Sequence, residues 1–161
     1  MIIKYTNLSE GVHNFEFDKE FHKIGLEKPF FGEVKLKTRL DKSHSQIVVD
    51  NKILLKARLT CDRCGKEFEA DLNNDFQIIY FFDEDRVKED DVNIKYLPPE
   101  EDSIDLTKDV YEYSMLSIPL KVLCSENCTN PSKYIVDNKD DDEKIDPVWE
   151  PLLKLKNKSN N

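Results

Sequence analysis

The stretch Glu33-Val-Lys-Leu-Lys-Thr-Arg-Leu-Asp41 alternates charged and apolar or uncharged residues over its whole length. Successive side chains of a β-strand point to opposite faces, so this period of two predicts a strand with one buried and one solvated face. A turn is expected at residues 43–45, a short strand at 46–49, a second turn at Asp50-Asn51, and another alternating strand from Lys52 to Thr60. Together these segments predict an antiparallel meander with one apolar face and one cationic face.

Weaker patterns on both sides of the meander extend the predicted sheet. Residues 2–5 and 11–18 are expected to form strands before it. Residues 76–82 have apolar side chains at both odd and even positions, so both faces of a strand there would be apolar. This suits either a strand buried on both faces or one packed under a helix. Residues 83–91 read as a charged loop, and residues 94–97 as a further short strand.

A helical pattern begins near Leu106. Apolar residues recur there at intervals of three and four up to Leu116, Asp105 or Thr107 can cap the start, and Pro119 closes the segment. We therefore predict one helix over about residues 106–117. The expected fold class is α+β, with a mainly antiparallel sheet, one central helix and a partly disordered acidic C-terminal tail.

The tail differs in character from the rest of the chain. Residues 137–146 hold six acidic residues and two lysines and are not expected to pack into a core. A short helix is expected around Trp149, because Pro147 suits the first position of a helix. These features divide the chain into an α+β domain of residues 1–128 and an acidic linker with a short helix in residues 129–161.

Charge and composition limit the classes of function. The net charge is −9, which makes non-specific coating of nucleic acid a poor default. Basic residues concentrate in residues 33–66, which hold nine Lys or Arg against four Asp or Glu. The sequence has neither an apolar run of about 18 residues, as a membrane span requires, nor the pattern of a signal peptide. We expect a cytoplasmic protein with reduced thiols.

The cysteines form two pairs, Cys61-x-x-Cys64 and Cys124-x-x-x-Cys128. A C-x-x-C at a hairpin tip points both sulfurs the same way, which is half of a tetrahedral zinc site, and the second pair can supply the other half. The alternatives are four thiols without metal, or a redox pair at Cys61 and Cys64. The redox alternative is disfavoured because the following Gly65-Lys66 resembles strand re-entry rather than the helix N-terminus that activates such pairs.

Basic residues of the alternating strands form a second candidate site. A row of like charge on a twisted sheet can hold an RNA backbone, whereas an ordinary solvated face that discourages edge pairing shows the same pattern. The lack of exposed aromatic residues between these charges weakens a model of base stacking. The candidate RNA-binding residues are Lys35, Lys37, Arg39, Lys56 and Arg58.

Catalysis finds little support in the sequence. None of His13, His22 and His44 belongs to a recognisable arrangement with serine or cysteine, and four glycines in all form no Gly-rich phosphate loop. We expect neither an enzyme nor a small-molecule substrate.

Three segments, in this order, carry a resemblance to a known family. They are Leu59-Thr-Cys-Asp-Arg-Cys64, then Ile104-Asp-Leu-Thr107 with the helix to Pro119 and Cys124-Ser-Glu-Asn-Cys128, and finally Ile145-Asp-Pro147 leading into residues 152–155. The chain resembles the YceD-like family, the large ribosomal RNA subunit accumulation proteins of bacteria and plastids. The resemblance implies a non-enzymatic cytosolic protein needed for normal accumulation or processing of 23S ribosomal RNA. Many members carry a further cysteine cluster after the position of Cys128, where this chain has none.

Three functional hypotheses follow. In the first, a ribosome-assembly factor binds ribosomal RNA or its precursor through the basic residues, while acidic segments meet a large-subunit ribosomal protein. In the second, a protein–protein adaptor has a structural zinc knuckle and no RNA contact, which the net charge favours. In the third, a thiol oxidoreductase needs a depressed pKa at Cys61 or Cys64.

Overall fold

The computed structural model describes residues 1–87 and 91–128, which lie in one compact unit, Met1–Cys128. The predicted α+β class, mainly antiparallel sheet with one helix, is confirmed for these residues. The predicted tail of residues 129–161 lies outside the described residues. The elements are β1 (Ile2–Lys4), β2 (Gly11–Glu20), η1 (Phe21–Ile24), β3 (Phe30–Lys42), β4 (Gln46–Thr60), β5 (Glu67–Phe81), η2 (Glu84–Arg86), β6 (Ile94–Tyr96), β7 (Ser103–Asp105) and α1 (Thr107–Leu116).

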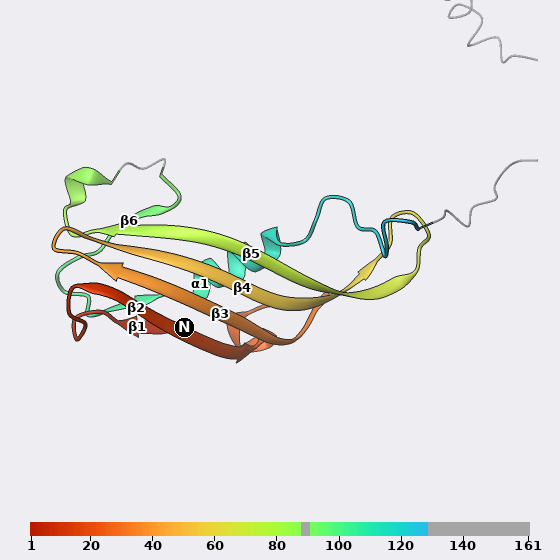
Figure 1. Cartoon of the computed structure of the whole chain (residues 1–161), viewed down its shortest axis with the longest axis horizontal. Coiled ribbons are helices and arrows are strands. Elements are labelled where there is room, and N and C mark those ends of the chain that lie inside the picture. The colour runs from red at the N-terminus through yellow and green to blue at the C-terminus, as the bar shows by residue number, and fades with distance from the viewer. Residues whose placement is uncertain (88–90, 129–161) are drawn as a thin grey trace, which may run out of the picture. The chain divides into compact units, whose positions relative to one another are not determined.

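The main sheet has five strands in the order β2-β3-β4-β5-β6, as Figure 1 shows. Strands β2 to β5 form an antiparallel meander that contains the one predicted for residues 33–60 and extends it by a strand on each side, and β6 joins its edge parallel to β5. A separate antiparallel pair joins β1 to β7, with Ile3 opposite Ile104. Strand β7 was not predicted, and it forms because both of these isoleucines are buried in the core.

One face of the main sheet holds the core, and we call it the inner face. Leu36, Leu40 and Ile53 are fully buried there, and α1 contacts β4 and β5. The ring of Tyr113 on α1 stacks on Phe76 of β5, with ring centroids 4.0 Å apart. Of the two alternatives for residues 76–82, packing under a helix is the one that the contact of Phe76 with Tyr113 supports. The opposite, solvated face of β2 to β5 is called the outer face.

Strand β4 continues through Asp50 and Asn51, so the predicted turn at these residues is wrong. Asn51 is 4% exposed on the inner face, where its side-chain oxygen accepts a hydrogen bond from the Thr38 hydroxyl at 2.8 Å. Asp50 points to the outer face and pairs with Arg39. Both polar residues keep the alternation of the strand because the neighbouring strand β3 supplies each with a partner.

Helix α1 agrees with the predicted segment to within one residue at each end. The N-cap position is Leu106, which makes no side-chain cap hydrogen bond, so neither predicted residue occupies it. Asp105, one residue earlier, accepts a hydrogen bond from the Thr107 amide at 2.9 Å and so satisfies a backbone donor at the helix start. Val110 is buried against the sheet, whereas Leu116 near the end is exposed. In the described part of the chain, no helix has the length and apolar character needed to cross a membrane.

Candidate metal centre and charged sheet face

Cys61 and Cys64 lie in the turn between β4 and β5, at the hairpin tip where the sequence predicts them. The Cys61 amide donates to the Lys66 carbonyl and the Gly65 amide to the Cys61 carbonyl, both at 2.9 Å. Gly65 has a φ of +69°, in the left-handed region that is unfavourable for residues with a Cβ. The chain then enters β5 at Glu67, as the predicted strand re-entry requires.

The segment before Cys124 is held against this turn by hydrogen bonds that do not involve sulfur. The Asp62 amide donates to the Val122 carbonyl at 2.8 Å, and the Val122 amide donates to the Asp62 carboxylate at 2.7 Å. The Arg63 guanidinium donates to the Cys128 carbonyl. Figure 1 shows residues 120–128 beside the tip of the β4–β5 hairpin. The protein backbone therefore brings the two cysteine pairs together.

The four sulfur atoms form a compact cluster. All four Sγ atoms lie within 4.8 Å of one another, with 3.8 Å between Cys61 and Cys128 and 3.8 Å between Cys64 and Cys124. Four thiolates at about 2.3 Å from a tetrahedral zinc ion are about 3.8 Å apart, whereas bonded disulfide sulfurs are about 2 Å apart. The cysteines carry thiols. The predicted meeting of the two pairs is confirmed, and the donor set fits tetrahedral zinc.

Hydrogen bonding and burial act on two of these thiols in opposite directions. Cys61 is 2% exposed and Cys128 is 8% exposed. Hydrogen bonds to backbone, that of Cys124 first and those of Cys64 and Arg63 after it, lower the pKa of Cys61 to about 6. Burial raises the pKa of Cys128 to about 12, because a thiolate loses its hydration there.

The cluster can bind a soft cation more readily than it can act on another protein. The lowered pKa of Cys61 meets the requirement that we set for a thiol oxidoreductase. A thiol that attacks a substrate must also be accessible, and Cys61 is buried. Its environment therefore favours metal ligation over thiol exchange.

The structure places all five predicted RNA-binding residues on the outer face, but that face is not of one sign. Acidic residues of β2, β4 and β5 lie beside the basic ones, so the expected single-sign face is wrong. Lys35 has no carboxylate of the described residues within ion-pair distance. The N–O distances of the other four are Lys37–Glu16 3.2 Å, Arg39–Asp50 3.1 Å, Lys56–Asp71 4.0 Å and Arg58–Glu69 2.8 Å.

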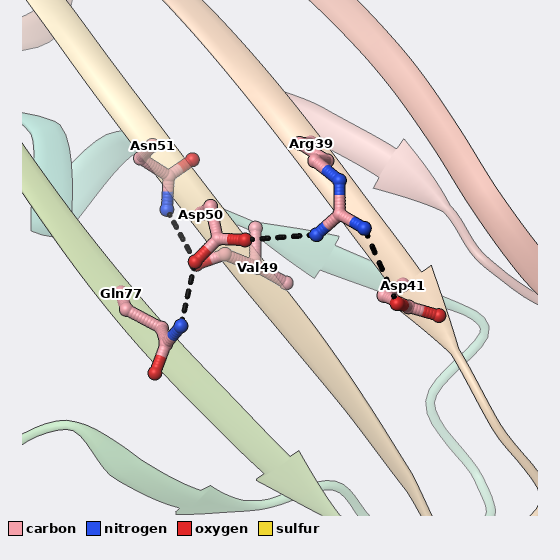
Figure 2. Close-up of polar contacts among 6 residues, drawn as sticks. All are labelled: Arg39, Asp41, Val49, Asp50, Asn51 and Gln77. Atoms are coloured by element: carbon pink, nitrogen blue, oxygen red, sulfur yellow. Dashed lines mark hydrogen bonds and ion pairs between the residues drawn. The ribbon is translucent and has the colours of Figure 1, made fainter.

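Around Arg39 these contacts become a network, drawn in Figure 2. Asp50 accepts hydrogen bonds from Arg39 at 3.1 Å and from the Gln77 amide at 2.6 Å. A second nitrogen of the Arg39 guanidinium lies 3.5 Å from Asp41. The network lies in a depression of about 600 Å³ across β2 to β5. An incoming phosphate would have to compete with two carboxylates for Arg39.

At the end of the outer face near the cysteine cluster, an aromatic ring lies among the cations. The β3–β4 register shifts between Phe31 and Lys35, where Gly32 has a φ of +76°. Phe31 precedes this shift and lies opposite Lys56. The Arg58 guanidinium stands 5.4 Å from the centre of the Phe31 ring.

A cleft of about 590 Å³ opens beside this pair. It is lined by Phe21, Lys28, Pro29, Phe31, Arg58 and Glu67, among other residues. Sequence reasoning missed this group and counted no aromatic residue between the cations. One signal in the sequence could have found it. Phe31, Lys35 and Lys37 are all odd-numbered, and alternate residues of a strand lie on the same face.

Comparison with known proteins shows where the chain belongs. It is 27% identical over 158 residues to the Bacillus subtilis (strain 168) protein named "Uncharacterized protein YlbN", with 88% of each chain covered. No solved structure matches. A family model described as "Large ribosomal RNA subunit accumulation protein YceD" matches residues 49–156, which include all four cysteines. Because this match covers more than half of the chain's own length, the chain belongs to the YceD family of large ribosomal RNA subunit accumulation proteins.

Proposed function

We propose that this protein supports the accumulation of large-subunit ribosomal RNA in the cytoplasm by binding ribosomal RNA, its precursor or a large-subunit ribosomal protein, and not by catalysis. The observation that carries the proposal is the family match over residues 49–156, whose description names this role. The outer face of β2 to β5 is exposed and charged, which supports a role in binding a charged macromolecule.

In this proposal the four cysteines hold one zinc ion with a structural role. Sulfur distances of 3.8 Å within each of the pairs Cys61–Cys128 and Cys64–Cys124 support it, as does the burial of Cys61 and Cys128. Zinc bound by four thiolates has no open position for a substrate, so its contribution is to folding. It would hold residues 121–128 on the β4–β5 hairpin tip.

The placement of the histidines supports a role without catalysis. The His13 ring contacts the Ser9 carbonyl at 2.9 Å, and His22 lies 3.3 Å from Glu20 at the surface. Neither contact involves a serine or cysteine side chain that the imidazole could activate as a nucleophile.

The test is an RNA measurement in cells that lack the gene for this protein. We expect the ratio of large-subunit to small-subunit ribosomal RNA to fall, and wild-type protein to restore it. A Cys124→Ser, Cys128→Ser variant should restore it less well, because the zinc anchor is lost. Ser125→Ala is the matched control, because it changes one small side chain in the same segment. An unchanged RNA ratio in the deleted cells would refute the proposed function.

An adaptor function without RNA contact is the second candidate, and the acidic part of the outer face favours it. Glu69, Asp71 and Asp75 lie along β5 and pair with Arg58, Lys56 and Lys52, so a basic ribosomal protein that docks there would compete with these partners. Purification of the tagged protein with and without nuclease separates the two candidates. A stoichiometric complex with a ribosomal protein that survives nuclease supports the adaptor, whereas its loss together with RNA supports direct RNA binding.

A further inference from the structure

We propose that the cleft between Phe21, Lys28 and Arg58 is a binding site for unpaired nucleotides of RNA. The proposal rests on the proposed function and deepens it. It assigns RNA contact to one defined cleft and not to the whole row of basic residues along β3 and β4. The cleft has a volume of about 590 Å³, within the usual range for sites that enclose a small planar group.

Planar groups in the cleft suit the faces of unpaired bases. Phe21 and Phe31 are both half-buried, so part of each side chain remains open to solvent. The Arg58 guanidinium lies over the Phe31 ring, 5.4 Å from its centre, so a base can stack on the outward side of the guanidinium plane or on the part of the ring that it leaves uncovered. Proteins bind single-stranded RNA by stacking its bases on aromatic rings and on arginine planes.

The charges of the cleft suit a nucleotide as well. Lys28 is exposed, and among the described residues no carboxylate lies within ion-pair distance of it, so its ammonium is available for a phosphate. Arg58 is held by Glu69 at 2.8 Å, which fixes its position on the ring side of the cleft. Glu67 supplies a carboxylate that can accept hydrogen bonds from the amino group of a base.

Single strands are favoured over duplexes. In a duplex the base faces are covered by their stacked neighbours, and only unpaired bases can be turned out onto a ring. The depression around Arg39 does not combine an available cation with an aromatic ring in this way, because Arg39 contacts two carboxylates. Phe15 and Phe76 also line that depression, but both belong to the inner face of the sheet.

The experiment uses the full-length protein, purified with zinc, and a labelled single-stranded RNA of about ten nucleotides, a length typical of single-strand sites. Fluorescence anisotropy measures the dissociation constant over a series of salt concentrations. Phe31→Leu removes the aromatic ring, and Lys28→Gln removes one positive charge. Arg58→Lys keeps the positive charge but replaces the planar guanidinium with an ammonium group. Lys52→Gln is the matched control, because it removes the same charge from a lysine outside the cleft, near Asp75.

We expect Phe31→Leu and Arg58→Lys each to weaken binding about five-fold or more, as the loss of base stacking does. Lys28→Gln should reduce the slope of log affinity against log salt by about 0.7, the value for one phosphate contact on a single strand. Lys52→Gln should change the affinity less than two-fold, and a matched duplex should bind more weakly than the single strand. Thermal melting checks that each variant is folded, and Lys28→Gln tests the cleft even if Phe31→Leu unfolds.

Several results would overturn this inference. If Lys28→Gln and Phe31→Leu bind the single strand as tightly as Lys52→Gln does, RNA contact lies elsewhere. If the wild-type protein binds no single strand, the cleft is not a nucleotide site, while the RNA ratio in deleted cells still decides the proposed function. If Phe31→Leu instead abolishes a nuclease-resistant complex with a ribosomal protein, the occupant is a peptide.

Discussion

Arg39 and Arg58 both lie on the outer face of the sheet, yet their surroundings differ. Arg39 lies between Asp41 and Asp50 in a network that also includes Gln77. Arg58 contacts one carboxylate, that of Glu69, and covers the ring of Phe31. An arginine of the same alternating pattern is therefore paired with two carboxylates at one end of the sheet, whereas at the other end it lies in a cleft with an aromatic ring. We call these the network end and the cleft end.

The difference shows that a basic strand pattern does not by itself define a nucleic-acid surface. The strand pattern predicts both arginines in one row of basic residues because they share a face. Which charges remain available depends on the residues that the neighbouring strands place opposite them. Figure 1 shows β4 and β5 continuing to the turn that joins them. This turn, at the cleft end, carries Cys61 and Cys64, so the two ends should also respond differently to metal.

The largest expected effect is from loss of the cysteine cluster. Cys61→Ser with Cys64→Ser should remove about one zinc per chain, because half of the four-thiolate site is gone. Elemental mass spectrometry measures the metal. Hydrogen exchange should then accelerate in residues 59–68 and 121–128, while residues 36–50 at the network end stay protected. Equal loss of protection at both ends would show that the cluster supports the whole sheet and not one end.

A smaller effect is expected on the inner face beneath the network end. Asn51→Leu leaves the buried Thr38 hydroxyl without its 2.8 Å partner. The free energy of unfolding in urea should fall by about 1–3 kcal/mol, the usual penalty for a buried unsatisfied polar group. Adding Thr38→Val should recover part of that loss, because both polar groups are then removed. A double variant less stable than the single one would show that packing, and not the hydrogen bond, dominates there.

At the cleft end, Gly65→Ala probes the backbone of the turn. A Cβ at Gly65 would meet no atom within 4 Å, so only its φ of +69° opposes the substitution. Stability should fall by about 1 kcal/mol, since left-handed backbone is unfavourable for residues other than glycine. Urea unfolding of the zinc-loaded protein measures the change, with Lys66→Ala as the control. The zinc content should stay at the wild-type value, and its loss would mean that the turn geometry itself sets metal binding.

The smallest effect belongs to the ion pairs of the network end. A double-mutant cycle of Arg39→Gln and Asp50→Asn should give a coupling energy of about 0.2–1 kcal/mol, because the pair is exposed. The coupling should shrink at high salt, which screens exposed charges. Lys35→Gln is the control and should leave stability nearly unchanged. A coupling well above this range would mean that the network rigidifies the sheet as a unit.

Prediction from sequence succeeded where a pattern is local. Alternation located β2, β3 and the second half of β4, and helical spacing located α1. It failed at Asp50-Asn51, which looked like a turn because both residue types favour turns, and in the first half of β5, where polar residues hide the strand. Thr38 and Arg39 stabilise Asn51 and Asp50 in the strand, and they come from β3.

The four-cysteine site was predictable because its residue types and spacing have few other uses. Their meeting nevertheless depends on the contacts of Asp62 and Arg63 with residues 122 and 128, which no local pattern indicates. The cleft was missed because Phe31 lies before the shift in β3–β4 register, and only that register brings it to Arg58.

Pattern and spacing along the chain were enough to assign residues to the core face, to locate the helix, to identify the side chains that can bind zinc and to place the chain in its family. The folded arrangement was needed to see that the sulfurs come within 4.8 Å, that Arg39 at the network end is paired with carboxylates, and that Arg58 covers an aromatic ring. Periodicity assigns a side chain to a face, whereas its neighbours on that face depend on strand register. Turns and the irregularity at Gly32 set that register.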